Sequence, residues 1–224
     1  MSATQYDAIA DAYASSEQFA MREHIETPVL TRALGPVTGL DVLDLACGPG
    51  NYTRAYKRAG ARRVVGVDIS PEMLRIALAE EAARPLGIEY QQHAAEALPS
   101  FAPFDAASAV YLLHYAESRE QLLRMCAGVH RNLKPGGRFF CLEFSRLAVG
   151  GLEPVYDFYS FNAIPALGKL LANDADSYRY LVESIRRFPD QETFLGMIRD
   201  AGFARAAYRN MAGGVCALHW GWSV

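Results

Sequence analysis

A glycine-containing turn and an acidic residue supply the residue types that could hold a nucleoside. The segment DLACGPG occupies residues 44–50 within and after a short apolar run, and Asp68 ends the next apolar run, VVGVD. Glycines in such a turn let the backbone approach a ligand closely, because side chains there would collide with it. A carboxylate at the end of the following strand is placed to accept hydrogen bonds from ribose hydroxyls. The pattern predicts a nucleoside site at the carboxyl edge of a parallel sheet.

The turn fits a ligand without phosphate better than a dinucleotide. The dinucleotide fingerprint GxGxxG is incomplete, because Thr53 stands at its third glycine position, and Pro49 lacks an amide that a pyrophosphate would use. S-adenosylmethionine (SAM) suits the pattern, with its ribose at Asp68 and its amino-acid end at the backbone between Asp44 and Gly50. A nicotinamide-dependent dehydrogenase is the alternative that this turn disfavours.

His114 is the candidate catalytic residue, as a general base. It directly follows an apolar run at 104–113, expected to be a strand ending at the same edge of the sheet. An imidazole has a pKa near the working pH, which suits a group that takes a proton from a ring hydroxyl. The alternative is a histidine that only lines or closes the pocket.

Short apolar segments alternating with helical segments must position these residues. Strands are expected at 41–46, 63–68, 88–91, 104–113, 138–144, 204–210 and 214–222, and helices at 26–34, 52–59, 71–84, 119–132 and 191–202. Residues 134–137 read as a turn before the fifth strand. This alternation predicts an α/β fold: a Rossmann-like, seven-stranded, mostly parallel sheet with helices on both faces and a C-terminal antiparallel hairpin.

The 224 residues fit a single domain. Within it we expect a helical lid at 1–38, a SAM-binding core at 39–145, a substrate-side insertion at 146–190 and a helix with the hairpin at 191–224.

Composition narrows the classes of partner and compartment. The net charge of −3, from 22 basic and 25 acidic residues, gives no reason to expect nucleic acid. The four cysteines are scattered without metal-ligand spacing, so we expect reduced thiols and no metal site. No apolar run approaches the ~18 residues that span a bilayer, and the N-terminus lacks the features of a signal peptide. We expect a cytoplasmic protein, monomeric or homodimeric.

Several motifs, in order, resemble those of class I SAM-dependent methyltransferases: DLACGPG, VVGVDIS, HAAEALP, FDAASAVYLLHY and LKPGG. The resemblance implies SAM as cofactor and S-adenosylhomocysteine as product. It also implies that the cofactor contacts Asp44, Ala46, Cys47, Gly48, Pro49, Gly50, Asp68, Ile69, Met73, Ala95, Glu96 and Tyr111. The family often has an aspartate where this chain has Ala94, so the usual contact to the adenine amino group falls to a neighbour or is lost.

The two ends of the chain resemble different methyltransferases. The motifs CLEFS, YDFYSF, SYRYLVESI, FPDQE and GGVCALH, between residues 141 and 219, are similar to those of the ubiquinone/menaquinone biosynthesis C-methyltransferases. The first 40 residues resemble small-molecule methyltransferases of the toxoflavin-synthase kind. The Arg-Asn pair that the quinone enzymes carry after strand four is absent here, where the sequence reads YLLHY.

These resemblances imply a methyltransferase acting on a small aromatic molecule, by C-methylation of a phenolic or quinol ring. The alternatives are N- or O-methylation of a small heterocycle, and a SAM-binding protein that transfers nothing. Tyr6, Tyr13, Tyr156, Tyr159, Phe161 and Arg179 are the candidate substrate contacts. A polyprenylated acceptor would bring the protein into peripheral contact with a membrane.

Overall fold

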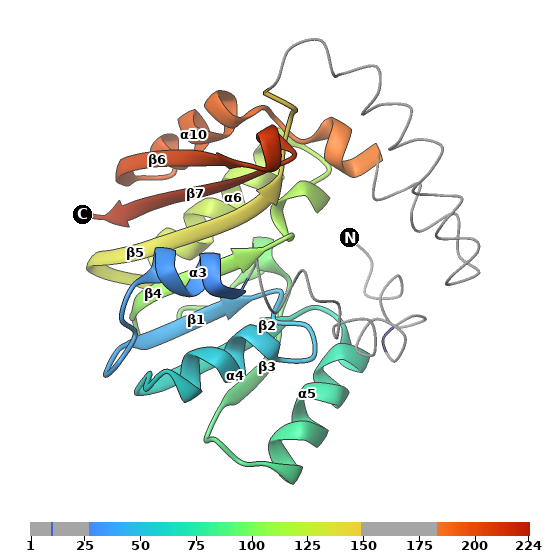
Figure 1. Cartoon of the computed structure of the whole chain (residues 1–224), viewed down its shortest axis with the longest axis vertical. Coiled ribbons are helices and arrows are strands. Elements are labelled where there is room, and N and C mark those ends of the chain that lie inside the picture. Colours follow the sequence, from blue (N-terminus) through green and yellow to red (C-terminus); the bar gives the residue numbers. More distant parts are fainter. Residues whose placement is uncertain (1–9, 11–26, 149–182) are drawn as a thin grey trace.

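Seven strands form one sheet in the computed structural model, which describes Ala10, residues 27–148 and residues 183–224. The strands are β1 (Asp41–Leu45), β2 (Arg63–Asp68), β3 (Glu89–Gln92), β4 (Phe104–Val110), β5 (Leu133–Phe144), β6 (Phe203–Met211) and β7 (Cys216–Ser223). Their order across the sheet is β3-β2-β1-β4-β5-β7-β6. Figure 1 shows β1 to β3 in the lower half of the twisted sheet and β5 to β7 in the upper half.

The predicted fold class is confirmed. β1 to β5 pair in parallel, whereas β7 is antiparallel to β5 on one side and to β6 on the other. β7 therefore inserts between β5 and β6, and a 3₁₀ turn at Ala212–Gly214 closes the hairpin.

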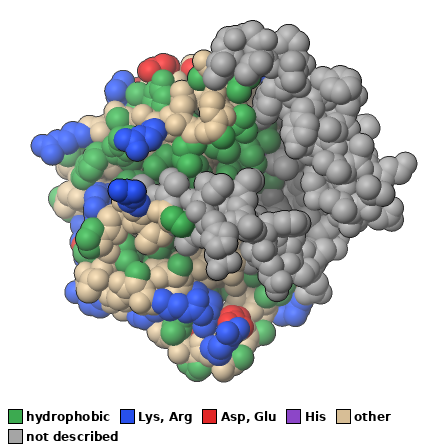
Figure 2. All heavy atoms as spheres, viewed as in Figure 1, with side chains coloured by type: hydrophobic (Ala, Val, Ile, Leu, Met, Phe, Trp, Pro, Cys, Tyr) green, Lys and Arg blue, Asp and Glu red, His purple; other side chains and the backbone are tan. Residues whose placement is uncertain are grey.

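Helices lie on both faces of the sheet. They are α3 (Thr27–Leu34), α4 (Asn51–Arg58), α5 (Pro71–Ala83), α6 (Arg119–Arg131) and α10 (Gln191–Asp200). Alternate residues of β1 show the two layers: Val42 packs with Leu34 of α3 and Tyr56 of α4, whereas Leu43 belongs to the core that includes α6 and α10. Figure 2 shows hydrophobic side chains gathered over the upper strands of one face, with Lys and Arg around them.

Local sequence signals explain where three helices begin. Ser70 accepts a hydrogen bond from the Met73 amide at 3.1 Å, and Pro71 occupies the first position of α5. Ser118 and Asp190 cap α6 and α10 in the same way. The observed helix boundaries lie within two residues of the predicted ones.

Two predicted boundaries are wrong. The strand expected at 104–113 ends at Val110, because Tyr111 takes a left-handed conformation with φ of 53° and a 3₁₀ turn follows at Leu113–Tyr115. Residues 134–137, expected as a turn, belong to β5, whose register against β4 shifts between Phe104 and Ala106. Gly136, with φ of 80°, lies in the part of β5 where the register shifts.

The strand order reverses between β1 and β4, and this reversal positions the site. The connections from β1 lead outward to β2 and β3, whereas β4 lies on the other side of β1 and leads to β5. The loops after β1 and β4 therefore diverge and leave a crevice at the carboxyl edge of the sheet, the usual ligand position in open α/β sheets.

Candidate functional site

The turn after β1 brings backbone to the mouth of this crevice. Ala46, Gly48 and Gly50 all have positive φ values, 51°, 53° and 94°. The turn is fixed by hydrogen bonds from the Cys47 amide to the Val67 carbonyl (3.1 Å) and from the Gly50 amide to the Cys47 carbonyl (3.0 Å). A Cβ atom at Gly50 would collide with the hydroxyl of Tyr90. Glycine is thus required there for both backbone conformation and space.

Asp68, the last residue of β2, is held by two backbone amides. Its Oδ2 accepts a hydrogen bond from the Gly48 amide at 2.8 Å, and its Oδ1 accepts one from the Ser70 amide at 2.9 Å. The half-buried side chain lines the cavity described below. These two amides therefore fix the orientation of the carboxylate at the cavity.

Asp44 lies inside the sheet beneath the turn. Its carboxylate is 1% exposed and accepts hydrogen bonds from the hydroxyls of Thr53 (2.6 Å) and Ser108 (2.8 Å). Burial raises the pKa of this carboxyl to about 6. Thr53 lies in the first turn of α4 and Ser108 belongs to β4, so Asp44 joins β1 to both elements.

A cavity of about 820 Å³, counted with its open mouth, lies at the carboxyl edge of β1, β2 and β4. Of the residues predicted to contact the cofactor, the lining includes Ala46, Gly48, Asp68, Ile69, Met73, Ala95, Glu96 and Tyr111. It does not include Asp44, Cys47, Pro49 or Gly50, which form or support the turn.

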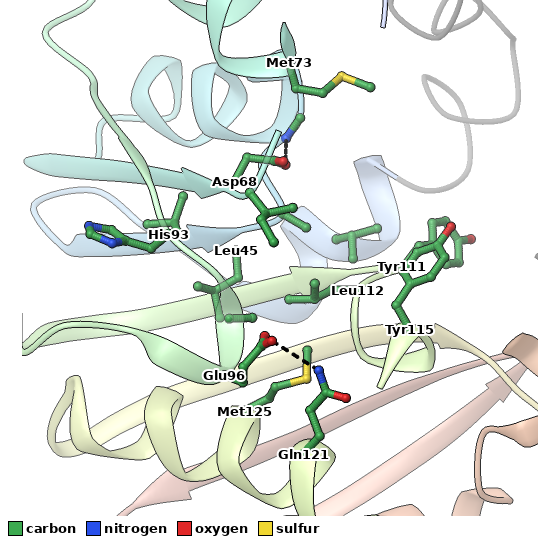
Figure 3. Close-up of a pocket in the computed structure, with 16 residues that line it drawn as sticks. Leu45, Asp68, Met73, His93, Glu96, Tyr111, Leu112, Tyr115, Gln121 and Met125 are labelled. Carbon is green, nitrogen blue, oxygen red and sulfur yellow. Dashed lines mark hydrogen bonds between the residues drawn. The ribbon is translucent and has the colours of Figure 1, made fainter. Parts of the chain in front are cut away.

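The cavity also has lining residues that the sequence reasoning did not assign: Val67, His93, Val110, Leu112, Tyr115, Gln121 and Met125. Gln121 Nε2 donates to Glu96 Oε1 at 3.2 Å, joining the first turn of α6 to the 3₁₀ turn at Ala95–Ala97. Figure 3 shows Glu96, Gln121 and Met125 on one side of the cavity and Asp68 and Met73 on the opposite side. Gln121 and Met125 are four residues apart, so the sequence predicts that they share a helix face, but it does not predict what that face contacts.

His114 lies in the 3₁₀ turn after β4, next to the cavity but outside its lining. Its imidazole is buried, and its Nδ1 lies 2.7 Å from Glu143 Oε2 on β5. Its Nε2 has no hydrogen-bond partner among the residues that the structure describes. The ring packs at 4.0 Å from the ring centroid of Tyr115, which does line the cavity.

The aromatic side of the cavity is ordered by packing. Tyr111 stacks on Phe144 with a centroid separation of 4.4 Å, and the Tyr111 hydroxyl lies 3.8 Å from Cys216 Sγ. Figure 3 shows Tyr111 and Tyr115 together at one end of the cavity. Flat apolar ligands favour such walls.

The predicted substrate contacts Tyr6, Tyr13, Tyr156, Tyr159, Phe161 and Arg179 lie outside the described residues. Within residues 27–148 and 183–224, no three His, Cys, Asp or Glu side chains gather as metal ligands would. In these same segments, no helix has both the length and the apolar character needed to cross a membrane.

Comparison with known proteins identifies relatives over nearly the whole chain. The model of the ubiE/COQ5 methyltransferase family matches residues 3–223. The ubiquinone/menaquinone biosynthesis C-methyltransferase UbiE of Acidiphilium cryptum is 48% identical over 184 residues, covering 81% of this chain and 73% of the relative. The UbiE protein of Ruegeria sp. is 43% identical over 197 residues, covering 85% and 77%.

Solved structures support the same fold at lower identity. A SAM-dependent methyltransferase from Mesorhizobium loti gives a TM-score of 0.63 at 24% identity, covering 87% of this chain and 96% of that one. Phosphoethanolamine N-methyltransferase 2 of Haemonchus contortus, solved in complex with SAM, gives 0.61 at 19% identity, covering 83% and 38%. The family match extends through the N-terminal residues, and the predicted toxoflavin-synthase resemblance of that region is not found among these relatives.

Proposed function

Because this chain belongs to the ubiE/COQ5 methyltransferase family and is a SAM-dependent methyltransferase, we propose that it methylates a ring carbon of a phenolic or quinol precursor in quinone biosynthesis. The observation that carries the proposal is the conjunction of this family match with a cavity at the strand-order reversal, lined by an oriented carboxylate on one side and by tyrosines at one end. The family supplies the acceptor class, and the cavity supplies a place for cofactor and ring together.

The residues at the turn fit SAM. We propose that Asp68 accepts hydrogen bonds from both ribose hydroxyls, because the Gly48 and Ser70 amides hold its carboxylate in the cavity lining at the carboxyl end of β2. The backbone from Ala46 to Gly50 would hold the methionine end. Asp44, Cys47 and Pro49 contribute by shaping that backbone, because none of their side chains lines the cavity.

At the adenine end, the cavity offers both apolar and polar contacts. Ile69, Met73 and Ala95 line it as apolar neighbours, and the hydrogen-bonded pair Glu96 and Gln121 offers a polar edge. We propose that this pair replaces the aspartate that such enzymes often carry at the position of Ala94. Buried polar groups of a ligand need such partners, since an unmade hydrogen bond costs ~1–3 kcal/mol.

The bound cofactor supplies a methyl group on a sulfonium, which is transferred as the carbon–sulfur bond breaks and a bond to the ring carbon forms. The protein contributes proximity, orientation and exclusion of water. A ring carbon is a weak nucleophile, and removal of a proton from the adjacent hydroxyl strengthens it. We propose His114 as the group that takes this proton, because its Nε2 has no partner among the described residues and its turn borders the cavity.

We further propose that the acceptor ring packs against Tyr111 and Tyr115 and against the predicted contacts Tyr6, Tyr13, Tyr156, Tyr159, Phe161 and Arg179. We propose that the protein is cytoplasmic and that a polyprenylated acceptor brings it into peripheral contact with a membrane surface. Monomer and homodimer both accommodate a cavity built from one chain, and sedimentation distinguishes them.

The test is mass spectrometry of products formed with methyl-labelled SAM and two separate acceptor pools. One pool contains demethylated quinol analogues with short isoprenoid tails, and the other contains nitrogen heterocycles related to toxoflavin. Label on a ring carbon of a quinol analogue supports the proposal. Label only in the heterocycles shows that the N-terminal resemblance determines the acceptor. No label in either pool, with SAM binding confirmed by calorimetry, supports a SAM-binding protein without transfer.

A further inference from the structure

Glu143 makes three hydrogen bonds to three consecutive residues after β4. Its side chain lies on β5, is fully buried, and is held between the sheet and the 3₁₀ turn at Leu113–Tyr115. Its Oε1 accepts the amides of Leu112, at 2.6 Å, and of Leu113, and its Oε2 lies 2.7 Å from His114 Nδ1. One carboxylate therefore orders both the backbone and the imidazole of this turn.

This arrangement determines which imidazole nitrogen carries the hydrogen. Two amide donors at Oε1 favour the ionised carboxylate, because hydrogen bonds to the charged form stabilise it. An ionised carboxylate only accepts, so Nδ1 must donate to Oε2. In the neutral ring, Nε2 is then the nitrogen with the lone pair, and this is the atom without a partner among the described residues.

We propose that Glu143 is a positioning residue that holds His114 in the tautomer able to accept a proton at Nε2. The inference rests on the proposed function, in which His114 takes the proton of the acceptor hydroxyl. In that step the O–H bond breaks, its electron pair stays on oxygen, and the proton binds Nε2. The imidazolium so formed lies against the Glu143 carboxylate, which stabilises its charge.

Two buried thiols near the pair stay neutral. Cys126 on α6 and Cys141 on β5 interact electrostatically with Glu143. Burial raises the pKa of the Cys126 thiol to about 12 and that of the Cys141 thiol well above its usual range. Tyr115 packs on the imidazole.

Glu143→Gln separates tautomer control from folding. The glutamine oxygen can still accept the Leu112 and Leu113 amides, so the turn keeps its backbone contacts. The glutamine amide would donate to Nδ1, which moves the ring hydrogen to Nε2 and removes the acceptor. Glu81→Gln is the control: Glu81 on α5 accepts the backbone amides of Leu86, Gly87 and Ile88 and pairs with the Arg54 side chain, but it lies outside the cavity lining.

The experiment combines ¹⁵N NMR of the His114 imidazole with steady-state kinetics as a function of pH. We expect an Nδ1–H signature in the wild type and an Nε2–H signature in Glu143→Gln. We expect kcat for methyl transfer to fall by about 100-fold or more in that variant, within the range that general-base catalysis contributes. The dissociation constant of SAM should change by less than about threefold, and Glu81→Gln should resemble the wild type throughout.

Two results would overturn the inference. An Nε2–H signature in the wild type contradicts it without any variant, even if Glu143→Gln fails to fold. If Glu143→Gln shows the Nε2–H tautomer but keeps the kcat and pH profile of the wild type, Glu143 has no role in methyl transfer. A wild type that binds SAM but methylates no quinol analogue contradicts the proposed function instead, whereas wild-type turnover that Glu143→Gln leaves unchanged contradicts the role of Glu143 alone.

Discussion

Asp68 is the single side chain on which cofactor affinity should depend most. Its carboxylate faces the cavity and also holds the amides of Gly48 and Ser70, so its loss removes ligand contacts and loosens the turn. We expect Asp68→Ala to weaken SAM binding by about 1–3 kcal/mol, because ribose hydroxyls are left unpaired. Calorimetric titration measures this, with the exposed Asp200→Ala as a control. Wild-type affinity in Asp68→Ala contradicts the proposed cofactor position.

His114 should affect turnover and not cofactor binding. If its Nε2 takes the acceptor proton, His114→Gln lowers kcat by on the order of 100-fold while the dissociation constant of SAM stays near that of the wild type. His130→Gln on α6 is the control, because His130 packs against Phe203 and lies outside the cavity lining. Equal losses of turnover and SAM affinity in His114→Gln would indicate a residue that only maintains the structure.

Some residues of the site could be predicted from sequence, and others could not. Asp68 and the glycine turn could, because their roles follow from local chain geometry at the ends of two successive strands. Gln121 and Met125 could not, since only the packing of α6 across the sheet edge brings them to Glu96. Glu143 was also missed, because its partners follow a different strand.

At the scale of elements, the turn between β1 and α4 depends on packing against β3. Tyr90 of β3 fills the space that a side chain at Gly50 would need, and its hydroxyl has no hydrogen-bond partner among the described residues. Gly50→Ala should therefore cost more than the ~1–2 kcal/mol of a left-handed backbone alone and should weaken SAM binding. Tyr90→Phe, which removes the colliding hydroxyl, should recover part of the loss.

Gly136→Ala separates backbone strain from collision. Gly136 also has a positive φ, 80°, but apart from its chain neighbours no described residue has an atom within 4 Å of the Cβ it would gain. Chemical denaturation measures the free energies of unfolding of Gly50→Ala, of Gly136→Ala and of the double variant that combines Gly50→Ala with Tyr90→Phe. Equal losses for Gly50→Ala and Gly136→Ala, or no recovery with Tyr90→Phe, would show that Tyr90 does not constrain the turn.

The types of the described elements could be predicted, but not all their ends. The apolar run at 104–113 continues through β4 into the following turn, so its composition does not reveal that the strand stops at Val110. The left-handed Tyr111 that ends it is held by a hydrogen bond from its amide to the Leu142 carbonyl of β5. Such a contact depends on tertiary structure and leaves no local signal.

At the scale of the whole molecule, two buried groups give opposite pH dependences of stability. Burial lowers the pKa of His219 to about 4, so the unfolded chain binds its proton first and stability falls as the pH drops from 6.5 to 4. Burial raises the pKa of Asp44 to about 6, so the folded chain binds that proton first and stability rises as the pH drops from 6 towards 3.8. Each effect is on the order of 3 kcal/mol, and the two largely cancel.

His219→Gln should remove only one of these opposing effects. The variant loses the buried imidazole that packs on Phe194, so it is less stable at pH 7. Between pH 6.5 and 4, however, its free energy of unfolding should rise by about 3 kcal/mol relative to that of the wild type. Denaturation at a series of pH values measures the difference. Parallel profiles for the two proteins would contradict a depressed pKa at His219.

The architecture could be predicted from alternating strands and helices, but the place of β7 could not. A hairpin presents two strands, and either could pair with β5. The structure pairs β7 with it through seven residue pairs from Arg138 and Trp222 to Phe144 and Cys216. β7 is buried along more of its length than β6, as an inner strand requires.

The most direct test of the central claim is the bonding position of the transferred methyl group. Incubation of the protein with ¹³C-methyl SAM and a demethylated quinol, followed by ¹³C NMR of the isolated product, distinguishes methyl groups on carbon, oxygen and nitrogen. The account predicts one labelled methyl group on a ring carbon adjacent to a hydroxyl. A label on the quinol oxygen, or an unlabelled quinol despite bound SAM, would contradict it.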